Sequence, residues 1–158
     1  MRRKKIGQKY FSGTVNVTDP CYDKDEVYRM DVNVKEGLYD CNIWHHKEEV
    51  KMDDGYTYTD VRVGVIGIYL DGKIPNVHNM EYIGTIGVDA GLAGFFIDKP
   101  DYNGYEWYQF CEDIRCKEDA WLKEVGFFSE SGYGDGGYPV YAAYDKENNV
   151  VALEIRFL

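Results

Sequence analysis

The chain has 158 residues, the size of one domain, and a folded chain of this length buries roughly two thirds of the surface that it exposes when unfolded. Its formal net charge is −10, although Arg2, Arg3, Lys4 and Lys5 concentrate positive charge at the start. Taking these four from the 18 basic residues leaves 14 against 28 acidic residues, a net charge of −14. Nonspecific nucleic-acid binding needs clustered Lys and Arg, so we expect no nucleic-acid partner. We interpret residues 1–9 as an untethered basic arm and residues 10–158 as a single globular domain.

No apolar run of 18 residues occurs, and the basic start does not lead into the apolar core of a signal peptide. We therefore expect a cytoplasmic protein with no membrane partner. The cysteines are too few for a disulfide scaffold, which favours reduced thiols. They are Cys21, Cys41, Cys111 and Cys116. Cys111 and Cys116, even with His45 and His46, lack the usual spacing of a zinc site, and we expect no cofactor there.

The pattern of the first half predicts strands. Fifteen tyrosines and 16% aromatic residues are typical of a sheet-rich protein. Alternation predicts strands at 12–17, 37–44 and 61–70, and Thr18-Asp19-Pro20 and Asp71-Gly72 predict turns.

The second half mixes strands with one helix. Recurring glycines between 81 and 96 disfavour a helix, so we expect a pair of strands with a sharp bend at 89–91. Trp107, Phe110 and Ile114 form a helical stripe within 105–125, and Trp121 roughly continues it. Residues 138–144 and 150–157 form a hairpin. The predicted fold is α+β, a mainly antiparallel, sheet-rich single domain with one helical segment packed on the sheet.

The segment 131–144 is the strongest candidate for a site, because four glycines surround Asp135 in a loop that leads into an aromatic strand. Glycines let backbone N–H groups approach a ligand, and tyrosine rings stack on planar ligands. Within this strand we expect Tyr138 to face the ligand. The predicted ligand-binding residues are Asp89, Gly91, Tyr133, Gly134, Asp135, Gly136 and Tyr138. Three turn carboxylates, Asp19, Asp89 and Asp135, are alternatively candidates to hold a divalent metal. Asp19 also fits a turn residue that binds neighbouring N–H groups.

Three motifs carry a resemblance: TDPCY at 18–22, VDAGLAGFF at 88–96 and SGYGDGGYPVY at 131–141. They resemble motifs of an uncharacterised family of small bacterial and phage proteins, over nearly the whole chain. The resemblance implies a single domain and a microbial or phage origin, and it transfers no catalytic residue. The middle motif of that family more often reads Val-Asp-Ser-Gly-Gln, so Ala90 and Leu92 depart from its polar positions.

The sequence favours a non-catalytic protein that binds a small, nucleotide-like molecule without a cofactor. From the kind of family, we expect a phage-type protein that sequesters a signalling nucleotide in counter-defence. Ser129 and Ser131 lack a nucleophile-elbow frame, and no histidine has an evident orienting partner. Whether the protein is an enzyme stays open. The alternatives are a metal-dependent hydrolase that uses the three aspartates, and a homo-oligomeric structural or interaction protein that pairs through its final strand.

Overall fold

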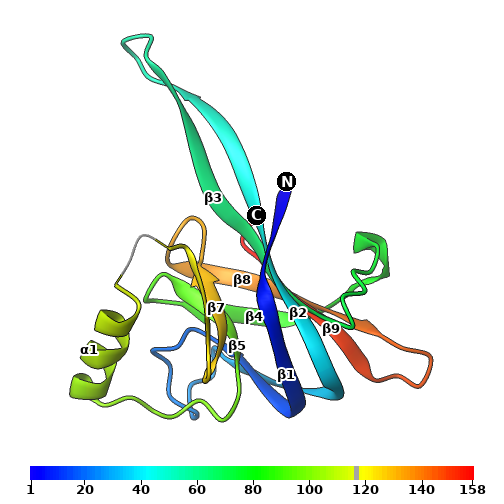
Figure 1. Cartoon of the computed structure of the whole chain (residues 1–158). Helices are drawn as coiled ribbons and strands as arrows, with labels where there is room; N and C mark the ends of the chain where they lie inside the picture. The colour runs from blue at the N-terminus through cyan, green and yellow to red at the C-terminus, as the bar shows by residue number, and fades with distance from the viewer. Residues whose placement is uncertain (116–117) are drawn as a thin grey trace.

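The computed structural model describes residues 1–115 and 118–158, and its main feature is one antiparallel sheet of nine strands (Figure 1). The strands are β1 (Arg2–Thr18), β2 (Met30–Lys51), β3 (Thr57–Leu70), β4 (Glu81–Val88), β5 (Leu92–Phe96), β6 (Ala120–Lys123), β7 (Gly126–Glu130), β8 (Gly136–Tyr144) and β9 (Val150–Arg156). Their order across the sheet is β4-β8-β9-β3-β2-β1-β5-β7-β6. A short 3₁₀ helix, η1 (Val77–Asn79), and an α-helix, α1 (Gly104–Asp113), complete the fold.

The sheet curls around a single main core. Side chains from one end of the strand order, such as Ile86 of β4 and Val140 of β8, belong to the same buried cluster as Phe95 of β5 and Phe127 of β7 at the other end. Phe11 of β1 lies in this cluster too. Alternating residues of each strand therefore point into the core, as the period of two in a strand requires.

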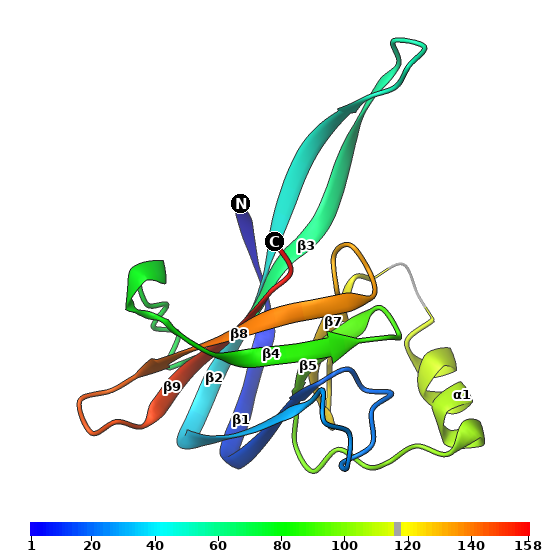
Figure 2. The ribbon, with the colours of Figure 1, turned by 180° about the vertical axis from the view of Figure 1, so that it is seen from behind.

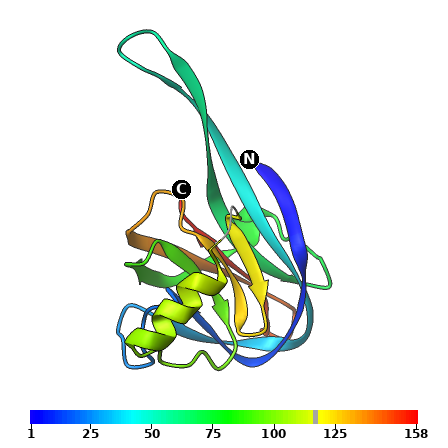
Figure 3. The same cartoon turned by 60° about the vertical axis from the view of Figure 1, so that its left-hand side comes forward.

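Helix α1 covers the outer face of β5, β6 and β7 (Figure 3). Asn103 begins the helix with a capping box, in which its side chain accepts the Glu106 N–H while the Glu106 side chain accepts the Asn103 N–H. Phe110 packs against Phe128, with 5.3 Å between the ring centroids. The predicted helix 105–125 is too long, because Trp121 lies in β6 and reaches the same cluster from a strand.

The hairpin of β2 and β3 extends beyond the body of the protein (Figures 1 and 2). Residues 46–51 and 57–62 pair only with each other, because β1 pairs with β2 up to His45 and β9 pairs with β3 from Val65 onward. The structure places residues 2–9 in β1, where they pair with β2, although the sequence predicts an untethered arm there. These basic residues are therefore part of the sheet.

The predicted sheet-rich, antiparallel architecture with a helix packed on the sheet is confirmed, although the ten-residue α1 makes α+β a weak label. The hairpin of β8 and β9 is confirmed as well. The segment 81–96 does form two strands, but they do not pair with each other: β4 pairs with β8, and β5 pairs with β1 and β7. No helix in the described ranges has the length and apolar character needed to cross a lipid bilayer.

Candidate functional site

The ends of β4 and β8 bring two of the predicted carboxylates together. Strands β4 and β8 lie side by side (Figure 2), and Val88, the last residue of β4, pairs with Gly136, the first residue of β8. Asp89 and Asp135 are therefore the next residues beyond this pair. Both line a cavity of about 770 Å³, which we call the carboxylate pocket. Its other walls come from Tyr22, Tyr28, Thr85, Ile86, Gly87, Val88, Gly136 and Gly137.

Asp19 does not line this pocket, but it stabilises one of the turns that do. Its side chain is fully buried. One carboxylate oxygen accepts the backbone N–H of Cys21 at 2.8 Å, and the other accepts the N–H groups of Asp89 at 2.8 Å and Ala90 at 2.6 Å. The turn after β4 is therefore fixed by a residue that lies 70 positions earlier in the chain. This is the turn-stabilising role expected as the alternative for Asp19, extended to a distant segment.

Tyr22 orients one of the two pocket carboxylates. Its hydroxyl donates a hydrogen bond of 2.8 Å to Asp89 Oδ2. Burial, followed by this hydrogen bond to Asp89, raises the pKa of the Tyr22 hydroxyl, so the tyrosine remains a donor at neutral pH. The neighbouring Cys21 is also not activated, because burial and the bonded Asp19 raise the pKa of its thiol to about 12.

Gly87 lets the two tyrosines approach β4 closely. A Cβ atom at Gly87 would lie 3.0 Å from the Tyr22 hydroxyl oxygen and 3.0 Å from Tyr28 Cβ. The Gly87 N–H donates to the Tyr28 carbonyl at 2.9 Å, which ties the segment between β1 and β2 to the pocket wall. Tyr22 is buried while Tyr28 is 61% exposed, so only the Tyr28 ring presents a broad open surface.

The structure places the other predicted ligand-binding residues outside the pocket lining. Gly91 accepts the Ser131 N–H through its carbonyl, and the Gly134 carbonyl accepts the hydroxyls of Ser131 and Tyr138. The Tyr138 ring turns inward against Phe157, with 5.0 Å between centroids, although the sequence predicts that it faces the ligand.

Tyr133 also lies away from the pocket lining. Its ring is covered by the Arg62 guanidinium, whose central carbon lies 4.7 Å from the ring centroid. Of the seven predicted ligand-binding residues, Asp89, Asp135 and Gly136 line the carboxylate pocket. The sequence analysis did not identify Tyr22 and Tyr28 as lining residues. Tyr22 could have been identified, because it lies in the TDPCY motif three residues after Asp19.

The charges of the lining limit what the pocket can hold. The residues that form it include two aspartates and no Lys or Arg. In the described part of the chain, no group of three His, Cys, Asp or Glu side chains is arranged to hold a metal ion. Asp19 is fully buried and does not line the pocket, so the three candidate aspartates do not meet in this cavity. His45 Nε2 lies 2.6 Å from Asp119 Oδ2, a carboxylate partner that the sequence did not reveal. Cys116 lies outside the described residues.

Comparison with known proteins found no matching family model, no matching curated protein and no matching solved structure. The resemblance carried by the three motifs stays a prediction. The geometry of the chain itself therefore carries the functional argument.

Proposed function

We propose that the protein binds a small ring-containing molecule in the carboxylate pocket and does not transform it. The observation that carries the proposal is the meeting of Asp89 and Asp135, from segments 46 positions apart, in one cavity beside two tyrosines. Ligand sites are commonly concave, with a few polar groups that converge on the ligand, and a volume of about 770 Å³ is within their usual range.

The chemistry of the walls supports a ligand that donates hydrogen bonds. Carboxylates accept bonds from amino and hydroxyl groups, and the exposed Tyr28 ring offers a surface for stacking. Two carboxylates without a lining cation disfavour a phosphate inside the pocket. We therefore refine the nucleotide-like prediction: the base and sugar would occupy the pocket, and any phosphate would remain in solvent.

The experiment is calorimetric titration with nucleosides and with their monophosphates. We expect the nucleosides to bind at least as tightly as the monophosphates. Tyr28→Ala should weaken binding about ten- to a hundredfold, because a stacked base contributes roughly 1–3 kcal/mol. Tyr105→Ala is the matched control, since Tyr105 is also exposed but lies on α1, outside the pocket.

Asp89→Asn and Asp135→Asn should weaken nucleoside binding, whereas Glu81→Gln on the same strand as the pocket wall should not. Tighter binding of the monophosphates that is indifferent to both aspartate variants would contradict the proposal. So would mass spectrometry that recovers a converted ligand after incubation. Intact ligand would support sequestration, the role that the phage-type prediction assigns.

Of the two alternatives from the sequence, pairing through the final strand is disfavoured because β9 lies between β8 and β3. The metal-dependent hydrolase is the other alternative. Titration with magnesium, manganese and calcium tests it directly, because an ion that binds the folded state must raise the melting temperature. Heat of binding together with ligand turnover would favour the hydrolase over the binding protein.

A further inference from the structure

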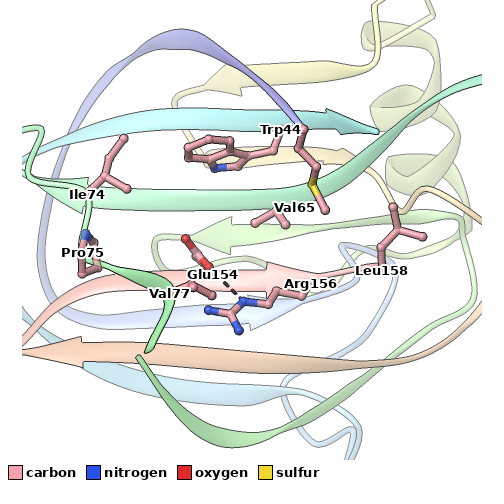
Figure 4. A pocket seen from close by; sticks show the side chains of 9 residues that line it. Trp44, Val65, Ile74, Pro75, Val77, Glu154, Arg156 and Leu158 are labelled. Atoms are coloured by element: carbon pink, nitrogen blue, oxygen red, sulfur yellow. Dashed lines mark hydrogen bonds and ion pairs between the residues drawn. The ribbon is translucent and has the colours of Figure 1, made fainter. Parts of the chain in front are cut away.

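A second cavity lies on the outer face of β2, β3 and β9, and its lining shares no residue with the carboxylate pocket. Its volume is about 470 Å³. Trp44, Val65 and Arg156 form its floor as register partners across the three strands. Ile74 and Val77, from the segment between β3 and β4, form a side wall (Figure 4). We call this cavity the outer pocket.

A buried chain of polar groups runs along the edge of the outer pocket. Glu154 is only 8% exposed, and its carboxylate accepts the Tyr69 hydroxyl at 2.6 Å and the Arg156 Nε–H at 3.0 Å. The Tyr69 oxygen in turn accepts the Trp44 indole N–H at 3.1 Å. Figure 4 shows Glu154 and Arg156 side by side in the otherwise mostly apolar cavity. Each of these hydrogen bonds fixes the orientation of the next polar side chain.

The Arg156 guanidinium has an N–H donor that these hydrogen bonds do not use. Its guanidinium carbon lies 3.7 Å from the centroid of the Tyr141 ring, which fixes the plane of the group. Its Nη2 atom is buried and has no hydrogen-bond partner within residues 1–115 and 118–158. A buried donor without an acceptor costs free energy, so a ligand acceptor that reaches Nη2 after a small adjustment of the Arg156 side chain in the cavity wall would be stabilising.

The side-chain charges in the lining cancel, because it contains one glutamate and one arginine that are already paired. A charged ligand would bring an ion for which no lining side chain offers a free counter-charge into a mostly apolar cavity. The acceptor should therefore be neutral. We propose that the outer pocket binds a small, uncharged, mostly apolar molecule that carries a carbonyl or a similar acceptor for Arg156.

The test uses three molecules that share a phenyl group on a short chain: the ketone benzylacetone, the anion hydrocinnamate and the cation phenylpropylamine. The readout is the indole N–H resonance of Trp44 in the nuclear magnetic resonance spectrum of the full chain. We expect benzylacetone to shift this resonance and to bind at least about tenfold more tightly than either ion. Equal or tighter binding of an ion would overturn the proposal, as would no shift of Trp44 at the solubility limit of benzylacetone.

Two variants and one control variant locate the binding. Val77→Trp should fill the cavity from its exposed wall and abolish the shift, whereas Val61→Trp, at an exposed position of the long hairpin, should leave it intact. The double variant Glu154→Gln, Arg156→Met removes both charges together and keeps an acceptor for Tyr69. It should weaken benzylacetone binding about tenfold by removing the arginine donor. Unchanged binding in Val77→Trp, or in a folded double variant, would refute the assignment.

Discussion

Replacing Asp19 tests how the carboxylate pocket is built. In Asp19→Ala, the N–H groups of Cys21, Asp89 and Ala90 lose their acceptor at once. A hydrogen bond to a charged group contributes about 1.5–3 kcal/mol, but partial hydration of the freed N–H groups makes the three losses less than additive. Three such bonds would sum to about 4.5–9 kcal/mol if they were additive, so we expect a smaller loss of about 3–5 kcal/mol in the free energy of unfolding.

The assay is urea unfolding of the wild type, Asp19→Ala and Asp19→Asn. Asn keeps one oxygen acceptor in place of two, so Asp19→Asn should lose less stability than Asp19→Ala. For a domain of this size, about 3–5 kcal/mol corresponds to a fall in melting temperature of roughly 6–20 °C. Asp23→Ala is the control, because Asp23 is an exposed acidic residue nearby in the same segment. A loss of less than about 1 kcal/mol in the free energy of unfolding of Asp19→Ala would refute the idea that Asp19 stabilises the turn after β4.

Three further predictions concern other parts of the fold. Gly67→Ala should destabilise the protein by about 1–3 kcal/mol in urea unfolding, because its Cβ would lie 2.2 Å from the buried Tyr69 hydroxyl oxygen; no change would contradict this close approach. The backbone N–H of Asn149, the largest cause, lowers the pKa of the Asp145 carboxyl to about 2, below its unfolded value of roughly 3.9. Its stabilising contribution should be complete above about pH 4 and disappear as the pH falls through about 2, and pH-dependent unfolding of Asp145→Asn should lack this component. Replacing residues 48–60 with Asn-Gly should change the melting temperature by only a few degrees, since none of them is buried; a large decrease would show that the hairpin end carries stability.

Local patterns in the sequence were enough to predict the strand-rich fold. The hairpin of β8 and β9 has alternating apolar residues on either side of a polar turn, and both signals lie within a few residues of one another. The strand 61–70 and its Asp71-Gly72 turn were predicted on the same grounds, and the structure gives both residues of the turn a positive φ.

Local patterns could not predict which face of its strand each side chain occupies. Whether Tyr138 faces a ligand or the core depends on which face of β8 the tertiary structure buries. Tyr138 shares its face with the buried Val140, and Phe157, which follows the paired strand β9, packs against its ring. The helix prediction failed for a similar reason. Trp121 fits the spacing of the helical stripe, but it contacts Phe128 from β6, whereas Phe110 contacts the same ring from α1.

The sequence by itself determined that Asp89 and Asp135 lie in glycine-rich turns, because glycine and aspartate favour turn conformations through purely local energies. Only the tertiary structure decided that these turns face one cavity and that Asp19, 70 positions before Asp89, stabilises one of them by hydrogen bonds. It also decided that Arg156 lines a second cavity and has an unused N–H donor. These features depend on strand order and sheet curvature. Both arise from the burial of one common core by all nine strands, and therefore from contacts between residues far apart in the chain.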